Sequence, residues 1–269
     1  MSRDEPVRHA AGLAYERAGS GSPLLLVHGL GSARSVWRPV LPALHTSYDV
    51  LTVDLPGHGD SPALPDGADV SPEALAASIL RLVDALGLDR PHVAGNSLGG
   101  WVALELAATG RVASVTALAP AGLWLVPRRP SRTISVNRGL ARHTTRLHPL
   151  VLGRSWGRAV TLRAYTTVAR RLETVTAVDA ARAMANATGF EAADAGMVGT
   201  RFFRGPDVPA DVAVTVAFGD DDRILPAGSC QDRRLAPAHA RWVTLTRCGH
   251  VPMWDVPDQT VRLIRSTTG

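Results

Sequence analysis

The chain has 269 residues, of which 45% are hydrophobic and 20% charged, and it is long enough to bury a sizeable core. Its net charge of +5 comes entirely from arginine, because the sequence has no lysine, and no nucleic-acid-binding motif accompanies it. No apolar run reaches the ~18 residues of a membrane span, and the first residues lack the apolar core of a secretory signal. We therefore expect a cytoplasmic protein with no nucleic-acid partner and no stable membrane span.

The sequence contains two cysteines, Cys230 and Cys248. Two cysteines do not build a disulfide framework, and this favours a reducing compartment. Cys248 is expected to pack as a small hydrophobe. No cysteine and histidine spacing typical of a metal site occurs, so the sequence predicts neither a metal nor a cofactor. It does not indicate an oligomeric state.

Strands and helices are predicted to alternate along much of the chain. The apolar run Leu24–Val27 is typical of a strand buried on both faces of a parallel sheet, and Ser71-Pro72 has the pattern of a helix start. Strands are expected as two short pieces within 6–18 and at 24–27, 48–55, 91–95, 112–118, 213–218 and 241–245. Helices are expected at 35–44, 71–86, 98–108, 227–235 and 257–266. This alternation predicts an α/β fold with a doubly wound, mostly parallel sheet.

The alternation stops between residues 123 and 206, where helices with irregular joints are expected and no buried strand is predicted. One helical stripe is expected within this range, at Thr161, Tyr165, Val168 and Leu172. We therefore predict a core domain made of 1–122 and 207–269, with 123–206 as a helical cap inserted into it.

The stretch Gly95-Asn96-Ser97-Leu98-Gly99 lies between a predicted strand and a predicted helix and has the G-x-S-x-G pattern of a nucleophile elbow. A serine on such a turn has a strained backbone and presents its hydroxyl away from the main chain. The two glycines have no Cβ, so the strand and the helix can approach each other closely. Ser97 is therefore the candidate nucleophile, with N–H groups of a helix N-terminus behind it.

A serine nucleophile needs a base, and the base needs an orienting acid. Two loops that follow predicted strands carry such residues: Asp220-Asp221-Asp222 after 213–218, and His250 after 241–245. Ligands of open α/β sheets bind at the carboxyl ends of the strands, where these loops lie. The order Ser97, Asp222, His250 along the chain is the order found in α/β-hydrolases.

Five ordered motifs make the chain resemble an α/β-hydrolase with a helical cap, over nearly its full length outside the cap. They are His28-Gly29-Leu30-Gly31, the stretch Asp54 to Ser61, Gly95 to Gly100, Gly219-x-x-Asp222-x-x-x-Pro226 and Gly249-His250-x-Pro252. The resemblance implies Ser97 as nucleophile, His250 as general base and then acid, and Asp222 as its orienting carboxylate. The Gly-x-x-Asp spacing of the family favours Asp222 over Asp220 and Asp221, which are expected to cap the following helix or bind loop amides.

The resemblance also implies an oxyanion hole made by the backbone N–H groups of Leu30 and Leu98. His28 and the stretch Asp54 to Ser61 are interpreted as structural parts of loops beside the pocket. The pocket is expected to be lined by Gly29, Trp124, Trp156, Phe190 and Val251, with core packing as the alternative for the three aromatic residues.

Serine at position 97 disfavours dehalogenase and epoxide hydrolase activity, because family members with those activities carry aspartate there. The leading hypothesis is hydrolysis of a small-molecule carboxylic ester or related acyl compound through an acyl-enzyme. Asn96 resembles hydrolases that cleave carbon–carbon bonds in ring-fission products, but such enzymes carry Trp where this chain has Val251. A perhydrolase, a thioesterase, and a hydrolase-fold binding or receptor protein with a vestigial triad are the further alternatives.

The predicted cap is rich in arginine: no acidic residue lies between Glu105 and Glu173, whereas twelve arginines do. Three interpretations are open. The arginines form an ordinary solvated surface, they attract an anionic ester, or they bind acidic lipid headgroups. In the second interpretation Arg128 and Arg129 are expected nearest the pocket mouth.

Overall fold

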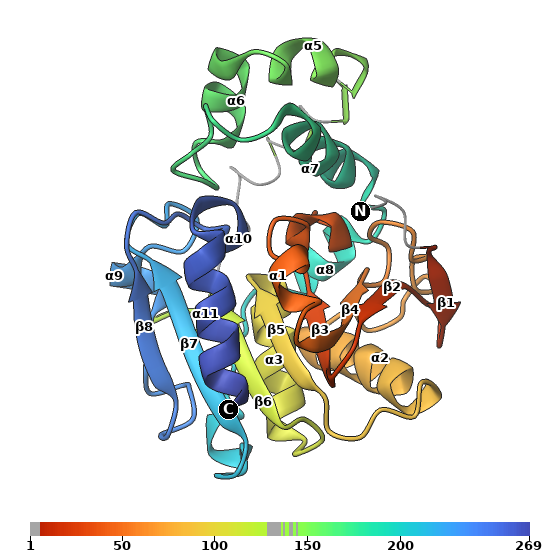
Figure 1. Cartoon of the computed structure of the whole chain (residues 1–269), viewed down its shortest axis with the longest axis vertical. Helices are drawn as coiled ribbons and strands as arrows, with labels where there is room; N and C mark the ends of the chain where they lie inside the picture. Colours follow the sequence, from red (N-terminus) through yellow and green to blue (C-terminus); the bar gives the residue numbers. More distant parts are fainter. Residues whose placement is uncertain (1–5, 128–135, 137, 140–141, 144) are drawn as a thin grey trace.

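The computed structural model describes residues 6–127, 136, 138–139, 142–143 and 145–269. Its centre is an eight-stranded sheet with the order β1-β2-β4-β3-β5-β6-β7-β8 (Figure 1). The strands are β1 Arg8–Ala10, β2 Leu13–Gly19, β3 Ser22–Val27, β4 Tyr48–Val53, β5 His92–Asn96, β6 Ser114–Leu118, β7 Ala213–Gly219 and β8 Arg241–Leu245. The β1–β2 and β2–β4 pairs are antiparallel and the other pairs are parallel, so the predicted mostly parallel α/β sheet is confirmed.

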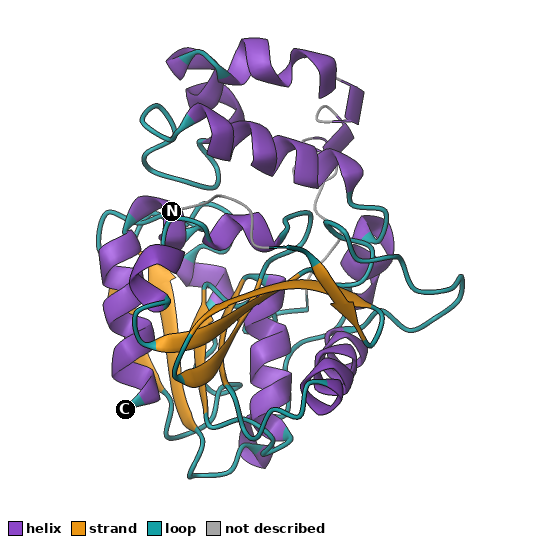
Figure 2. Cartoon of the chain, turned by 45° about the vertical axis from the view of Figure 1, so that its right-hand side comes forward, coloured by secondary structure: helices purple, strands orange, loops and turns teal. Residues whose placement is uncertain are grey.

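Side-chain alternation along the strands divides the core into two layers. Leu25 and Val27 of β3 face one buried cluster, whereas Leu24 and Leu26 face the other. Helices α2 (Pro72–Ala85) and α3 (Leu98–Ala108) cover the first face. The 3-10 helix η1 (Arg34–Trp37), α1 (Leu41–Leu44) and α11 (Pro257–Thr268) cover the second. Helices therefore lie on both faces of the sheet, as a doubly wound fold requires (Figure 2).

The other helices for which the described residues give bounds lie in or after the predicted cap. They are η2 Thr145–Leu147, α5 His148–Leu152, α6 Ser155–Leu162, α7 Thr174–Asn186, α8 Phe190–Met197, η3 Gly205–Asp207, α9 Ala227–Cys230 and α10 Pro252–Asp255. Helices α5, α6 and α7 lie above one end of the sheet in Figure 1. Their buried side chains form a small cluster separate from the two core layers, made of Leu152, Leu162, Ala169, Leu172, Ala177 and Val178.

The predicted range 123–206 combines two kinds of packing. Its middle forms the separate cluster of α5–α7, whereas its ends pack into the main core through Leu123, Trp124 and Phe202. The Phe202 N–H donates to the Gly122 carbonyl at 3.0 Å, which joins the two ends of the range. The domain boundaries at 122/123 and 206/207 stay a prediction.

Three predicted helices differ from the observed ones. The expected helix 35–44 is split into η1 and α1, because Pro42 has no N–H for a continuous helix and starts a new one instead. The expected helix 227–235 ends at Cys230, and the Asp232 N–H then donates to the Leu123 carbonyl at 2.7 Å. The stripe from Thr161 to Leu172 does not form one helix, because α6 ends at Leu162.

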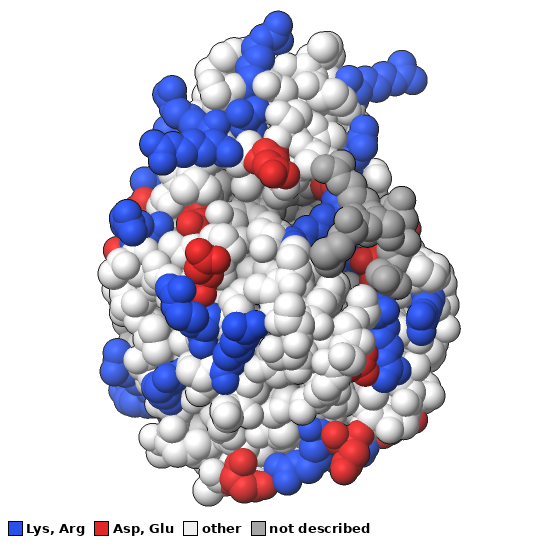
Figure 3. Space-filling view, viewed as in Figure 1, with Lys and Arg blue, Asp and Glu red and all other residues white. Residues whose placement is uncertain are grey.

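Arginine side chains project from the upper helices of the molecule (Figure 3). Arg128 and Arg129, expected at the pocket mouth, lie outside the described residues. Within the part of the chain that the structure describes, no helix is both long enough and apolar enough to cross a membrane.

Candidate active site

Ser97 lies on the sharp turn between β5 and α3. Its φ of 57° and ψ of −117° are unfavourable for an L-residue, and backbone hydrogen bonds hold it there. The Ser97 N–H donates to the Leu118 carbonyl at 2.9 Å, and the Ala121 N–H donates to the Ser97 carbonyl at 2.9 Å. A Cβ on Gly95 would collide with the Gly99 carbonyl, so β5 and α3 come this close only because a glycine stands there.

His250 and Asp222 form a buried pair. His250 Nδ1 lies 2.9 Å from Asp222 Oδ2, and because a carboxylate only accepts, Nδ1 carries the proton and Nε2 remains as an acceptor. The second oxygen of Asp222 accepts from the N–H groups of Ile224 at 2.9 Å and Leu225 at 2.8 Å. Burial alone would raise the pKa of Asp222, but the nearby His250 and these hydrogen bonds outweigh it and lower that pKa. The carboxylate is therefore held ionised against the ring.

The three consecutive aspartates have different partners. Asp220 accepts from the backbone N–H groups of Arg247 and Cys248, both at 3.0 Å. Asp221 forms an exposed ion pair with Arg223 at 2.7 Å. Among these three described aspartates, Asp222 is the one that contacts His250.

Hydrogen bonds with Asn96, Tyr165 and Asp255 hold the loop that carries His250, and the sequence did not predict this role for them. The Asn96 side chain donates to the His250 carbonyl at 3.0 Å. The His250 and Val251 N–H groups both donate to the Tyr165 carbonyl, at 2.9 and 3.1 Å. Asp255 accepts from the Gly249 N–H at 2.6 Å and from the Thr166 hydroxyl. Tyr165 acts through its carbonyl group, which any residue has, so no sequence signal could have identified it.

The loop after β3 lies directly against the elbow. A Cβ built on Gly29 would be 2.9 Å from Ser97 Cβ, which leaves room only for glycine at this position. Leu30 follows in the same loop, and Leu98 begins α3, where the first N–H groups have no partner within the helix. The two predicted oxyanion residues therefore lie on the two segments that meet at Ser97.

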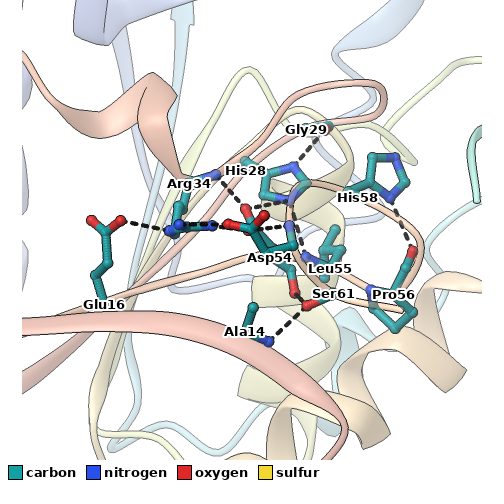
Figure 4. Close-up of polar contacts among 11 residues, drawn as sticks. Ala14, Glu16, His28, Gly29, Arg34, Asp54, Leu55, Pro56, His58 and Ser61 are labelled. Carbon is teal, nitrogen blue, oxygen red and sulfur yellow. Dashed lines mark hydrogen bonds and ion pairs between the residues drawn. The ribbon is translucent and has the colours of Figure 1, made fainter. Parts of the chain in front are cut away.

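A buried polar network holds the loop after β3 in place (Figure 4). His28 Nδ1 donates to the Gly29 carbonyl at 2.7 Å, and His28 Nε2 accepts from the Leu55 N–H at 3.0 Å. Asp54 accepts from the Arg34 N–H at 2.7 Å and forms an ion pair with the Arg34 guanidinium. We call this group of His28, Arg34 and Asp54 the loop frame. Burial lowers the pKa of His28, so its ring is neutral and can accept from one side while it donates from the other.

Ser97 and His250 line a cavity of about 460 Å³ beneath the predicted cap. The expected residues Gly29 and Val251 also line it, together with Leu30. Most of the other walls come from the upper helices and the loops beside them, at Leu147, Val151, Leu152, Val160, Leu162, Ala180, Ala181 and Met184. Among the described residues that line the cavity, none is Asp, Glu, Lys or Arg. The cavity is therefore mostly apolar, with polar side chains at the Ser97 and His250 end and at His148 and Thr161 of the upper helices.

The structure corrects three expected pocket residues, because Trp124, Trp156 and Phe190 are not among the described lining residues. Trp124 packs edge-on against Trp101 in the main core, with ring centroids 5.3 Å apart. Trp156 is exposed on α6. Phe190 is buried beneath Arg138, whose guanidinium carbon lies 4.8 Å from the ring centroid. Aromatic side chains cannot be assigned to a pocket from the sequence, because burial in a core satisfies them equally well.

A sequence profile described as the alpha/beta hydrolase family matches residues 24–263. The chain belongs to the alpha/beta hydrolase family. The matched range contains all the candidate site residues, from Gly29 to Val251. The family resemblance inferred from the five motifs is thereby confirmed.

Similar proteins include an esterase and an acetyltransferase component. The chain is 44% identical over 110 residues to the pimeloyl-[acyl-carrier protein] methyl ester esterase of Methylococcus capsulatus, with 40% of each protein covered. It is 41% identical over 112 residues to the dihydrolipoyllysine-residue acetyltransferase component of the acetoin cleaving system of Pseudomonas putida, covering 40% of this chain and 30% of that protein. The chain thus spans less than half the length of these curated relatives.

Solved structures resemble this chain over nearly its whole length. The enol-lactonase from Burkholderia xenovorans is 25% identical with a TM-score of 0.75, covering 97% of this chain and 99% of that one. A thermophilic esterase from Thermogutta terrifontis is 24% identical with a TM-score of 0.72, covering 94% and 92%. At that identity the esterase supports the fold alone.

The described residues include no second candidate centre built on a metal-binding cluster or on Cys248. No group of three or more His, Cys, Asp or Glu among them is placed to hold a metal ion. Cys248 is buried, and burial raises the pKa of its thiol. A thiol with a raised pKa is a poor nucleophile at neutral pH.

We predict that His58, which lies beside the loop frame, makes the stability of the protein sensitive to acid. This ring lies 5.3 Å from His28 between centroids, and burial lowers its pKa to about 4. The unfolded chain then binds the proton more readily, so stability present above the ordinary pKa of 6.5 is lost as the pH falls toward 4. We expect the free energy of unfolding to drop by about 3 kcal/mol over this range, and denaturant titrations at several pH values measure it.

The variant His58→Gln should show a clearly smaller decrease over the same pH range, because glutamine does not titrate. The matched control is His9→Gln at an exposed position, which should keep the wild-type decrease. Equal pH dependence of wild type and His58→Gln would contradict the prediction.

Proposed function

We propose that the protein is a serine hydrolase that cleaves a carboxylic ester through an acyl-enzyme intermediate. The observation that carries the proposal is the buried Asp222–His250 pair beside the strained Ser97, with both Ser97 and His250 at one apolar cavity. Similarity to a methyl ester esterase and to an enol-lactonase supports an ester as the substrate. Ser97 is then the nucleophile, His250 the base, and Asp222 the residue that orients and stabilises the ring.

The proposed reaction has two halves. In the first, Ser97 Oγ attacks the ester carbonyl carbon while His250 Nε2 takes the hydroxyl proton, and the Leu30 and Leu98 N–H groups donate to the oxyanion. The intermediate collapses when His250 returns that proton to the departing alcohol, which leaves an ester on Ser97. In the second half, a water molecule attacks this ester, again with His250 as base and then acid. The acid product leaves and Ser97 regains its proton.

Two alternatives are weighed against ester hydrolysis. Carbon–carbon bond hydrolysis would use the same three residues, but position 251 carries a small apolar valine that is buried against the second core layer. The structural similarity to the meta-cleavage product hydrolase of Pseudomonas fluorescens is at 21% identity and supports the fold alone. A binding or receptor protein of this fold would not react with a fluorophosphonate, whereas the proposed nucleophile should be labelled at Ser97. A ring-fission diketone tested beside simple esters separates the two enzymatic activities.

We predict that Ser97→Ala and His250→Ala each lower kcat on the order of 10⁴-fold or more, and that the double variant loses little beyond either single one. The reason is that both residues act in the same proton transfer. Steady-state kinetics with a p-nitrophenyl ester measure kcat. Additive losses in the double variant would contradict the assignment.

The acid is tested by a matched pair of substitutions. Asp222→Asn should lower kcat by about 10³–10⁴-fold, because the amide favours the wrong tautomer of His250. Asp220→Asn should lower it by less than about tenfold, because position 220 contacts backbone N–H groups and not His250, and the single asparagine oxygen can still accept from one of the Arg247 and Cys248 N–H groups. A larger loss for Asp220→Asn would move the acid to that position.

We predict that Gly29→Val abolishes esterase activity while the protein stays folded. The added Cβ would lie 2.9 Å from Ser97 Cβ, so the loop must move and carry the Leu30 amide away from the oxyanion. The control, Leu30→Ala, should keep most activity, because the proposed role uses only its backbone. Circular dichroism and ester kinetics together test both variants. A folded and fully active Gly29→Val protein would exclude this oxyanion hole.

We predict that the cavity accepts neutral acyl chains. Each added methylene of a p-nitrophenyl ester should raise kcat/KM about fourfold until the cavity is filled, since a buried methylene contributes about 0.8 kcal/mol. An ester with a second carboxylate should react more slowly, because no Lys or Arg is among the described residues that line the cavity.

The length preference is tested by narrowing the cavity. Ala181→Leu on α7 should shift the preferred chain to a shorter one, because Ala181 lines the cavity. Ala183→Leu is the matched control on the same helix, since Ala183 is not among the described lining residues. A preference for the dicarboxylate monoester would contradict the neutral-acyl interpretation.

A further inference from the structure

Four large apolar side chains are exposed on the two upper helical segments. Leu147 is 50% exposed and Leu150 61%, and these residues are three apart at the start of α5. Trp156 is 56% exposed and Val160 68%, and these residues are four apart on α6. Residues three or four apart lie on the same face of a helix, and α5 and α6 pack against each other. We call these four residues the apolar patch.

The apolar patch continues into the cavity. Leu147 and Val160 belong to the patch and also line the cavity that contains Ser97 and His250. Leu150 and Trp156 extend the same faces outward and are not among the described lining residues. The patch therefore borders the route by which an apolar molecule would reach the serine.

Arginines lie at the ends of α5 and α6, in a stretch of the sequence that contains no aspartate or glutamate. Arg146 and Arg154 flank α5, and Arg163 follows α6, all of them exposed. None of these three forms an ion pair with a residue that the structure describes, and the side chain of Arg154 instead donates to the Leu150 carbonyl at 3.2 Å. Arginine side chains project from the same upper helices in Figure 3. Exposed arginines thus lie at the ends of both helices that carry the apolar patch, and we call Arg146, Arg154 and Arg163 the arginine rim.

We propose that the apolar patch and its arginine rim bind the surface of an anionic lipid layer, from which the ester substrate enters the cavity. Arginines bind acidic headgroups, while Leu, Val and Trp side chains enter the boundary between headgroups and acyl chains. The helices are short, so they lie on the layer without spanning it. The second part of the proposal, substrate entry, rests on the proposed esterase function, whereas the binding itself does not.

A second copy of the chain fits this surface less well. In a two-fold symmetric dimer the same patch lies on both subunits, so each arginine rim would face the other rim. Like charges held together across an interface are unfavourable. An anionic lipid surface supplies the opposite charge, and this complementarity favours lipid as the occupant.

The binding is measured by co-sedimentation with vesicles of phosphatidylglycerol and, in parallel, of phosphatidylcholine. We expect binding to the anionic vesicles that weakens as salt is added, and much weaker binding to the zwitterionic ones. Arg146→Gln combined with Arg154→Gln should weaken binding to the anionic vesicles by about 30-fold, or about fivefold for each charge. The control Arg8→Gln combined with Arg262→Gln removes the same net charge at exposed positions outside the cap and should have little effect.

The contribution of the apolar side chains to vesicle binding is tested with one variant in the patch and one control variant outside it. Trp156→Ser should weaken vesicle binding by at least tenfold, because an aromatic side chain no longer enters the layer. Phe203→Ser is the control, since Phe203 is also exposed, at 58%, and lies beneath Arg201 outside the upper helices. It should bind vesicles like the wild type.

Substrate entry is tested by comparing an ester embedded in vesicles with a soluble ester. Trp156→Ser and Leu150→Ser should lower the rate on an ester embedded in phosphatidylglycerol vesicles at least tenfold, while kcat/KM for a soluble short-chain ester stays within twofold. Ser97→Ala should bind vesicles as the wild type does. This variant separates binding from catalysis, because it keeps the docking surface and lacks the proposed nucleophile. A wild-type protein that binds vesicles but hydrolyses no ester would contradict the esterase function and not the docking surface.

Three outcomes would overturn the proposal. The first is the absence of vesicle binding, and the second is equal binding to anionic and zwitterionic vesicles. The third is a dimer in solution that Trp156→Ser converts to a monomer without any change in vesicle binding, which would assign the patch to a second copy. Light scattering of wild type and variant measures that third outcome.

Discussion

The structure depends on one close backbone contact, between the loop after β3 and the elbow after β5. The contact requires glycine on both segments: a Cβ on Gly99 would collide with the Val27 carbonyl, and one on Gly29 would press on Ser97 Cβ at 2.9 Å. Because the two segments touch, a helix N-terminus and a loop amide lie on either side of the same serine. The strained backbone of Ser97 persists because its neighbours hold it by hydrogen bonds on both sides. The candidate site is therefore a consequence of how β3, β5 and α3 pack.

The polar groups of the loop frame are paired, and this makes the loop geometry rigid. His28 bonds both the Gly29 carbonyl and the Leu55 N–H, and Asp54 accepts from the Arg34 N–H and pairs with its guanidinium. A buried network of this kind stabilises only when its members have partners, because an unpaired buried polar group costs about 1–3 kcal/mol. The neutral state of His28 is part of the same constraint, since a charged ring could not accept from Leu55. The loop frame thus holds Gly29 and Leu30 in place. Its own side chains are not among the described residues that line the cavity.

Hydrogen bonds connect the loop that carries His250 to the segment that follows α6. The Tyr165 carbonyl accepts from His250 and Val251, and Asp255 joins the Gly249 N–H to the segment after α6. The same segment leads into the helices that form most of the apolar walls. A displacement of these helices would therefore shift the loop that carries His250. If the apolar patch binds a lipid layer as proposed, the segment after α6 connects the helix that meets the lipid to the loop that carries His250.

The sequence by itself determined the sheet, the elbow and the order of the candidate triad, because these depend on local patterns. Apolar runs predicted the buried strands, the glycines of Gly95 to Gly99 predicted the tight turn, and the spacing after Gly219 indicated Asp222, which the structure brings to His250. Only the tertiary structure decided which aromatic residues meet the cavity, since Trp124, Trp156 and Phe190 satisfy the same apolar pattern in a core, on a surface or in a wall. It also decided how the histidine loop is held, because the Tyr165 carbonyl is common to every residue type. Contacts between residues far apart in the sequence produce no local sequence pattern, so they could not be predicted from the sequence.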